Sequence, residues 1–340
     1  MVRLIDEIRE QSEVIARALE HNRDTARLVA VAAGQCTHAV IAARGTSDNA
    51  GRYAQYVWGT RNRLSVGLTT PSLFSIYDRP PKLTDALVVG ISQSGQSPDI
   101  VSVLEEGRSQ NRPTVALTND PESPLAKAAD VVVNLVAGVE RSVAATKTYT
   151  STLAMVALIS DAIDPDGAAL SEMAPSVTGV LGLDEEIERA ARAFADIEHC
   201  AVLGRGFNHA TAFEWALKLQ ELTQVVAQPF STADFLHGPV AVVEPGYPVL
   251  AVTVRGPAHA EVSEVLGRAA ATGARLLTIS NDPALAELAG HHVTIPGEPE
   301  EWLTPVPAIV AAQLFAYHLT LAKGLDPEQP RGLKKVTRTT

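Results

Sequence analysis

The sequence repeats one pattern of strand ends at a nearly constant offset, and this repeat limits the possible folds more than any other feature. Gly206 follows an apolar run as Gly45 does, at an offset of 206 − 45 = 161 residues. Gly256 and Gly95 end the next matching runs, again with 256 − 95 = 161. An Asn-Asp-Pro turn also recurs. Because such matches are hard to obtain by chance, we predict two copies of one unit.

Apolar runs typical of buried strands alternate with helical stretches in both copies. In the first copy these runs are 38–43, 87–91, 114–117 and 131–136. Strands separated by helices predict parallel sheets covered by helices. The expected fold class is therefore α/β, with two tandem units, each a parallel β-sheet flanked by helices in a flavodoxin-like three-layer sandwich.

The same pattern divides the 340 residues into segments, two of which have the size of a domain. A stretch rich in acids and helix breakers, near 161–167, marks the junction between the copies. The expected segments are an N-terminal helical segment 1–34, a first unit 35–165, linker helices 166–195, a second unit 196–325 and a C-terminal tail 326–340.

Composition excludes several classes of protein. Hydrophobic residues make up 46% and charged residues 20%, which excludes disorder as the main state. The net charge of −11 repels nucleic acid and anionic membranes, so neither is expected as a partner. Only two cysteines occur, which favours a reducing compartment. The N-terminus is acidic and no run of about 20 apolar residues is evident, so we expect a cytoplasmic protein.

The copies differ most just after the second strand of each. The first copy has Ser92, Gln93 and Ser94 before its glycine, whereas the second has Thr-Val-Arg at 253–255. Ser97 follows at an expected helix start, so hydroxyls and an amide surround a helix N-terminus at the carboxyl end of a parallel strand. This arrangement favours a neutral pocket for one phosphate. Ordinary turn and helix-capping chemistry is the alternative.

Three charges lie on one stripe of an otherwise apolar helix in the second copy. Glu214, Lys218 and Glu221 have the spacing i, i+4, i+7. A solvent-exposed stripe with an ion pair is the usual meaning of that spacing. The apolar surroundings favour a buried helix instead, in which a carboxylate can serve as general base. His237 stands beside a turn, where a histidine is more often structural than catalytic.

Other motifs are incomplete. The loop at 204–206 lacks the third glycine of a dinucleotide-binding fingerprint, because His209 occupies that position. The stretch 90–94 lacks the final glycine of a nucleophile elbow. No two histidines have helical i, i+4 spacing. We therefore expect neither a cofactor nor a metal.

Taken together, these residues resemble the double sugar-isomerase (SIS) family, in particular the isomerase half of glucosamine-6-phosphate synthases. The resemblance runs from about residue 38 to the end. Six motifs in the family's order carry it: Gly45-Thr46-Ser47, Ser92-Gln93-Ser94-Gly95, Val143-Ala144-Ala145-Thr146-Lys147, Glu214-x-Ala216-Leu217-Lys218-Leu219-x-Glu221, Leu236-His237-Gly238-Pro239 and Gln329-Pro330-Arg331-x-Leu333-x-Lys335.

The resemblance implies that a hexose phosphate lies between the two copies. Glu221 then matches the base that moves a proton between sugar carbons 1 and 2 through an enediol-type intermediate. His237 matches the histidine that assists ring opening and is donated by a neighbouring subunit, which implies a homodimer with shared sites. Lys335 matches a lysine that contacts the open sugar and can form a Schiff base with a ketose. The implied substrate-binding residues are Thr46, Ser47, Ser92, Gln93, Ser94, Ser97, Val143, Ala145 and Lys218.

The sequence departs from the synthase pattern in two ways. Ala145 stands where the synthases have a serine, and Lys334 replaces a small residue. Because the match begins near residue 38, we expect no glutaminase domain. The sequence at 144–147 more closely resembles that of stand-alone deaminases of amino-sugar phosphates. The first hypothesis is therefore an isomerase/deaminase of an amino-hexose 6-phosphate, most simply glucosamine 6-phosphate to fructose 6-phosphate and ammonia.

Two alternatives remain open. One is a lyase, dehydratase or deglycase of the same family acting on a 2-N-substituted hexose 6-phosphate, such as N-acetylglucosamine 6-phosphate or a fructosamine 6-phosphate; Ala145 makes room for an altered substituent. The other is a non-catalytic phosphosugar sensor. The second is less favoured, because Glu221, His237 and Lys335 are all present and the first 37 residues are too short and acidic for a DNA-binding helix-turn-helix.

Overall fold

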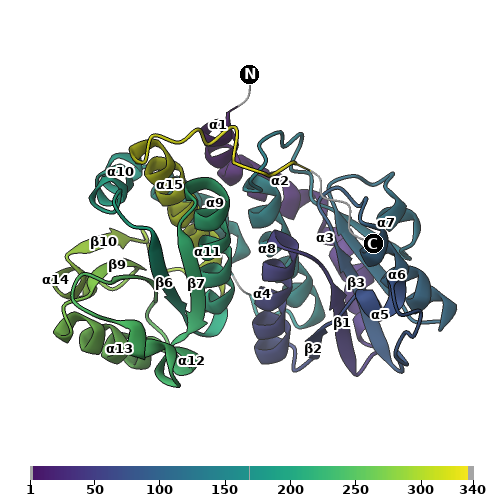
Figure 1. Cartoon of the computed structure of the whole chain (residues 1–340). Coiled ribbons are helices and arrows are strands. Elements are labelled where there is room, and N and C mark those ends of the chain that lie inside the picture. Colours follow the sequence, from purple (N-terminus) through teal and green to yellow (C-terminus); the bar gives the residue numbers. More distant parts are fainter. Residues whose placement is uncertain (1–2, 168, 336–340) are drawn as a thin grey trace. The chain divides into compact units, whose positions relative to one another are not determined.

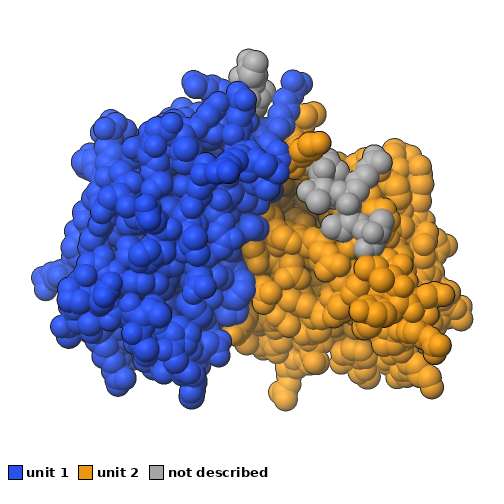
Figure 2. Space-filling model, viewed as in Figure 1, with its two compact units in different colours: residues 1–12, 141–146, 171–333 blue, residues 13–140, 147–170, 334–340 orange. Residues whose placement is uncertain are grey.

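The computed structural model describes residues 3–167 and 169–335. The chain forms two compact units, coloured separately in Figure 2. Unit 1 comprises 1–12, 141–146 and 171–333, and unit 2 comprises 13–140, 147–170 and 334–340. The predicted tail is described as far as Lys335, and its residues 336–340 lie outside the described part of the chain.

Unit 2 contains a parallel sheet with the strand order β2-β1-β3-β4-β5 (Figure 1). The central strand β3 is buried along its whole length, as its unbroken apolar sequence predicts. Its strands are β1 (His38–Ala42), β2 (Ser65–Leu68), β3 (Ala86–Ile91), β4 (Thr114–Thr118) and β5 (Val131–Asn134).

Helices flank this sheet and complete the core of unit 2. A Cβ atom on Gly90 of β3 would collide with Leu104 and Leu125, so helices pack closely against the strand there. The helices are α3 (Arg23–Ala33), α4 (Thr46–Arg61), α5 (Ser72–Ser75), α6 (Pro98–Ser109), α7 (Pro124–Lys127) and α8 (Lys147–Ile163), with α2 (Gln11–His21) beginning in unit 1 and continuing into unit 2.

Unit 1 contains a second parallel sheet, with the order β7-β6-β8-β9-β10. Its strands are β6 (His199–Gly204), β7 (Val226–Ser231), β8 (Pro248–Val252), β9 (Arg275–Ser280) and β10 (His291–Thr294). Its helices are α1 (Leu4–Arg9), α9 (Met173–Leu181), α10 (Asp184–Ala193), α11 (His209–Thr223), α12 (Thr232–Leu236), α13 (His259–Ala271), α14 (Leu285–Ala289) and α15 (Pro305–Ala322).

The two sheets have the same topology, since β6 to β10 follow the same spatial order as β1 to β5. The first strand of each sheet is followed by a glycine with a left-handed backbone, Gly45 at φ +53° and Gly206 at φ +59°. The predicted α/β fold, with two parallel sheets flanked by helices, is confirmed.

Helix α15 bears on the expectation that no run of about 20 apolar residues occurs. Within the described residues, one helical stretch, Glu301–Ala322, is long and apolar enough to cross a membrane (22 residues, mean hydropathy 1.3). However, 78% of its most apolar window is buried inside the protein. In addition, Phe315 makes an edge-to-face contact with Trp215 of α11, with ring centroids 5.6 Å apart. These contacts are those of a core helix of unit 1.

Candidate functional site

The residues predicted to bind phosphate gather at one edge of the unit 2 sheet. Thr46 and Ser47 begin α4 directly after β1, and the segment 92–97, here called the serine loop, follows β3. Because β1 and β3 are parallel neighbours, their carboxyl ends share an edge. That edge is where open α/β sheets bind ligands.

The serine loop is tightly held by backbone hydrogen bonds. The amide of Ser92 donates to the Leu117 carbonyl at 3.1 Å, and the amide of Leu125 donates to the Gly95 carbonyl at 3.1 Å. Gly95 has φ +60°, and a Cβ there would collide with the Ser123 side chain. Only glycine fits this position without strain, so the loop has a defined shape rather than a loose one.

Helix α6 begins where the serine loop ends, with Ser97 as its N-cap and Pro98 in its first turn. The Ser97 side chain makes no capping hydrogen bond with the helix, so its hydroxyl does not satisfy the helix end. Asp99 is fully buried, and Arg44 Nε donates to its Oδ2 at 2.9 Å. Asp99 is therefore the partner of Arg44, and an anion here would be held by hydroxyls and the helix N-terminus.

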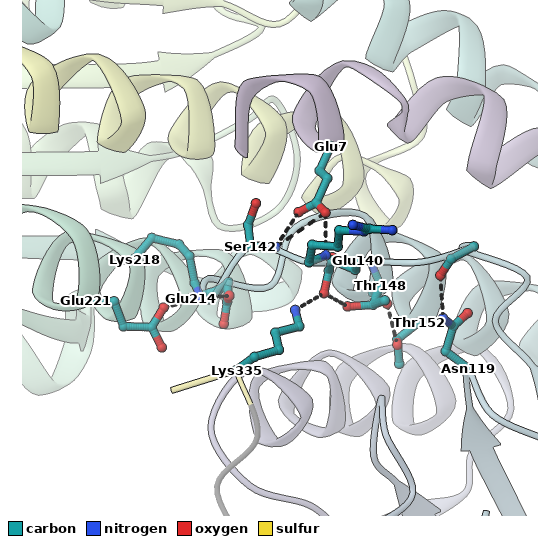
Figure 3. Close-up of polar contacts among 12 residues, drawn as sticks. Glu7, Asn119, Glu140, Ser142, Thr148, Thr152, Glu214, Lys218, Glu221 and Lys335 are labelled. Carbon is teal, nitrogen blue, oxygen red and sulfur yellow. Dashed lines mark hydrogen bonds and ion pairs between the residues drawn. The ribbon is translucent and has the colours of Figure 1, made fainter. Parts of the chain in front are cut away.

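Two of the three charges of α11, Glu214 and Lys218, are buried, and the third, Glu221, is half-buried beside them. Lys218 Nζ lies 2.5 Å from Glu221 Oε2 and 3.4 Å from Glu214 Oε1 (Figure 3). The side chains of Glu214 and Lys218 are 0% and 1% exposed. This burial excludes the solvent-stripe alternative. The three-residue set is here called the α11 charge cluster.

Opposing effects act on the ammonium at the centre of the α11 charge cluster. Burial acts to lower the pKa of Lys218, but the attraction of Glu214 and Glu221 outweighs it, so the pKa ends above its ordinary value. Lys218 thus stays charged at neutral pH, and two carboxylates share one cation. Glu221 is the accessible member, with its side chain 22% exposed. A partly exposed carboxylate held by a buried cation can accept a proton from a bound substrate.

His237 occupies a different place in unit 1. It directly follows the last residue of α12, and its side chain is exposed. Its amide donates to the Asp234 carbonyl at 3.1 Å. Among the described residues, no hydrogen bond or ion pair joins His237 to Glu221. The fold of one chain therefore does not bring the predicted ring-opening histidine to the predicted base by direct contact.

One buried carboxylate that no sequence motif marks holds the backbone just before Val143. In unit 1, Glu7 accepts the amides of Arg141 at 2.5 Å and Ser142 at 3.2 Å. Glu7 is fully buried although it is an acid. The sequence contains one indication of this burial. Glu7 lies three residues after Leu4, on the face of α1 that is otherwise apolar.

In unit 2, the buried carboxylate of Glu140 accepts a hydrogen bond from the Thr148 hydroxyl at 2.8 Å and pairs with Lys335 Nζ at 2.7 Å. Figure 3 shows Lys335 pointing toward Glu140. This pair gives the predicted tail lysine a fixed position. It also identifies Glu140 as a residue that sequence motifs alone did not single out.

The predicted site residues thus fall into two sets. Unit 2 contains Thr46, Ser47, the serine loop and Lys335, whereas unit 1 contains the α11 charge cluster and His237. Val143 and Ala145 belong to unit 1 as well, and both are half-buried. Within residues 3–167 and 169–335, no group of three or more His, Cys, Asp or Glu side chains is arranged to hold a metal ion.

Curated proteins with similar sequences include aminotransferases. The chain is 35% identical over 308 residues to the glutamine--fructose-6-phosphate aminotransferase [isomerizing] of Halobacterium salinarum, covering 87% of this chain and 51% of that protein. The corresponding protein of Legionella pneumophila (strain Paris) is 30% identical over 347 residues, covering 98% of this chain and 57% of that protein. The chain therefore spans about half the length of the curated relatives that it matches.

Solved structures support the same relationship. The C-terminal domain of glucosamine-fructose-6-phosphate aminotransferase from Francisella tularensis has a TM-score of 0.86 and 28% identity, covering 96% of this chain and 98% of that one. Glucosamine-6-phosphate deaminase from Thermotoga maritima, at 19% identity and a TM-score of 0.79 with 99% of each chain covered, shows a shared fold. The SIS domain family matches residues 34–160 and again 193–323. With two such matches on its two parallel sheets, the chain belongs to the SIS domain family.

Proposed function

We propose that this chain is a phosphosugar isomerase that deaminates an amino-hexose 6-phosphate, most simply glucosamine 6-phosphate to fructose 6-phosphate and ammonia. The observation that carries the proposal is the α11 charge cluster. A cluster of two carboxylates and one lysine, almost wholly buried, is costly to fold and is typical of a reactive site. Its accessible end is the carboxylate of Glu221, the group that the reaction needs.

The serine loop supports the phosphate part of the proposal. Ser92, Gln93, Ser94 and Ser97 would bind the phosphate group, together with Thr46 and Ser47 on the neighbouring strand end. A protein with a net charge of −11 must bind an anion through local groups. The helix N-terminus of α6 and the adjoining hydroxyls are groups of that kind.

Glu221 supplies the proton transfer. In the open-chain amino sugar, Glu221 removes the proton on carbon 2. The electron pair of that bond forms a double bond to carbon 1, and the carbon 1 carbonyl oxygen takes up a proton from water, which gives an enol-type intermediate. Return of the proton to carbon 1 leaves an imine at carbon 2. Water adds to that imine and ammonia leaves, which gives the ketose. One carboxylate that reaches both carbons is sufficient for both transfers.

Three further residues complete the proposed reaction. His237 would assist ring opening, and its exposed position after α12 suits a group offered to a neighbouring subunit of a homodimer. Lys335 would contact the open sugar. Lys218 would orient the Glu221 carboxylate through their ion pair. The relatives named as fructose-6-phosphate aminotransferases support an amino-sugar and ketose pair as the substrate class.

An ammonia-release assay with Glu221→Gln tests the proposal. The substitution keeps the size of the side chain and removes the base, so we expect ammonia release from glucosamine 6-phosphate to fall at least a hundredfold, on the order of the loss of a general base. Glu264→Gln is the matched control, because Glu264 forms an exposed ion pair with Arg268 on α13. Activity that survives in Glu221→Gln would contradict the assignment.

A second candidate reaction uses the same base on a different substituent. Ala145 is small and half-buried. Beside the sugar, it would leave room for a larger group on carbon 2. This observation favours elimination or deglycation of a 2-N-substituted hexose 6-phosphate. Incubation with N-acetylglucosamine 6-phosphate, followed by ultraviolet absorbance of an unsaturated product, distinguishes this reaction from ammonia release. Binding of both sugars without either product would instead indicate a sensor.

A further inference from the structure

Glu140 connects the start of α8 to the C-terminal tail. Its carboxylate accepts the amide of Thr148 at 3.1 Å and the hydroxyl of the same residue at 2.8 Å. Lys335 Nζ donates to Glu140 Oε2 at 2.7 Å. All three residues belong to unit 2, although Lys335 follows Glu140 by 195 residues. Figure 3 shows these contacts converging on one carboxylate.

The burial of this carboxylate makes the lysine important. The Glu140 side chain is 0% exposed, whereas that of Lys335 is 23% exposed. A buried carboxylate is stable only when charge and hydrogen-bond donors compensate for its lost hydration. Thr148 provides neutral donors, and Lys335 provides positive charge beside the carboxylate. Removal of Glu140 therefore leaves the Lys335 side chain without its carboxylate partner, and removal of Lys335 leaves the buried carboxylate with less positive charge beside it.

We propose that Glu140 is a positioning residue that anchors the tail and fixes the place of the Lys335 side chain through their ion pair. This inference rests on the proposed function in one respect, since it assigns the anchored lysine to the sugar site. An ammonium ion attracts the oxygens of an open-chain sugar but has no lone pair to attack a carbonyl. While the ion pair is intact, Lys335 therefore acts as a positive contact and not as a nucleophile.

Imine formation with a ketose then requires transfer of one proton. If the Lys335 ammonium gives its proton to the Glu140 carboxylate, the neutral amine can add to the ketose carbonyl, and water leaves as the imine forms. Glu140 thus controls which of the two chemical roles Lys335 performs. The role does not depend on Glu140 touching the sugar, so the residue acts through Lys335.

Competitive acetylation tests the anchoring without any substrate. Acetic anhydride forms an amide with a neutral amine and releases acetate, so its rate reports how free the amine is. Lys334 is exposed and adjacent, which makes it an internal reference. We expect Lys335 to react about tenfold more slowly than Lys334 in the full-length protein, as a buried charge-assisted hydrogen bond implies. Equal rates for the two lysines in the unaltered protein would overturn the proposal.

Glu140→Gln is the informative variant, because glutamine keeps an oxygen for the Thr148 amide and removes the charge. In this variant the rates of Lys335 and Lys334 should agree within about twofold. Thr148→Val removes the hydroxyl donor and keeps the ion pair, so it should change the Lys335 rate less. A Glu140→Gln protein that remains folded by circular dichroism and shows the unaltered ratio contradicts the proposal.

Kinetics provide the second measurement. Glu140→Gln should raise KM for the sugar phosphate and lower kcat/KM about tenfold, and the same substitution added to Lys335→Ala should have little further effect. Full additivity of the two substitutions would overturn the proposal. If acetylation behaves as expected but the unaltered protein turns over no amino-sugar phosphate, the anchoring stands and the proposed function fails. The two failures are therefore distinguishable.

Discussion

The two copies of the fold use the same helix in opposite ways. Helix α4 of the first copy and α11 of the second each follow the first strand of their sheet. Positions that correspond at the offset of 161 residues hold Tyr53 and Glu214, Val57 and Lys218, and Thr60 and Glu221. Tyr53 and Val57 are fully buried and apolar in character, whereas Glu214 and Lys218 are fully buried and charged. An apolar solution is therefore available to this fold, and the charges in α11 reflect a role other than stability.

The loops after β3 and β8 differ in a complementary way. In the first copy, Gly95 adopts a left-handed backbone and the serine loop closes against Ser123. In the second copy, a Cβ on Gly256 would meet the carboxyl group of Glu301, which also lies near Gly206. The second copy thus places its own carboxylate at the strand ends where the first copy has its serine loop. One copy retains a candidate anion site, and the other fills the equivalent place with an acid.

The largest expected effect concerns the buried lysine of the second copy. Lys218→Met leaves Glu214 buried without its cation, which should cost about 3–5 kcal/mol in free energy of unfolding. Adding Glu214→Leu restores an apolar arrangement like that of the first copy and should recover much of the loss. Urea denaturation measures both variants. If Lys218→Met has the same free energy of unfolding as the unaltered protein, Lys218 does not stabilise the buried charge of Glu214, and this explanation of α11 is wrong.

The second prediction compares the two glycines. Gly95→Ala adds a Cβ that collides with the short Ser123 side chain at a left-handed residue, with a strain of about 2–5 kcal/mol. We expect binding of fructose 6-phosphate, followed by calorimetry, to weaken about a hundredfold. Gly256→Ala displaces only the flexible end of Glu301 and should leave this affinity unchanged. Equal losses in both variants would mean that the two loops are not functionally different.

The smallest expected effect concerns Glu301, whose carboxyl group lies against Gly256 in the second copy. Burial raises the pKa of Glu301 above its ordinary value, so its ionised form destabilises the folded state. This destabilisation is absent in acid, where the carboxyl is protonated, and appears as pH rises past its ordinary pKa. Glu301→Gln should therefore raise the melting temperature slightly at pH 7. The gain should disappear once the pH falls below the ordinary pKa of a glutamate side chain. A gain that grows in acid would contradict this explanation.

Local patterns in the sequence were sufficient to predict the duplication, the parallel sheets and the chemical difference between the loops. Strand ends and hydroxyl-rich turns depend on nearby residues, so their positions can be read directly. The burial of Glu214 and Lys218 was left open, because i, i+4 spacing describes both an exposed pair and a buried one. Only packing by other elements decides between these possibilities.

Contacts between distant residues account for what the sequence did not predict. Glu7 binds amides 134 and 135 residues further along the chain, and Glu140 pairs with a lysine 195 residues further along. Neither acid belongs to a local sequence motif from which its partner can be predicted. Helix α15 was missed as an apolar helix for a different reason, since prolines at its start and interspersed polar residues conceal its apolar character.

The assignment of residues to the two units does not follow the boundary of the duplication. Unit 1 is built mainly from the second copy, yet it includes 1–12 and 141–146 from the other half of the chain. Gln11, for example, donates to Gln313 of α15 at 2.8 Å, and both side chains are buried. A gene cut between the copies would thus yield two products that each lack part of a unit. The compact units of the chain therefore do not coincide with its two repeats.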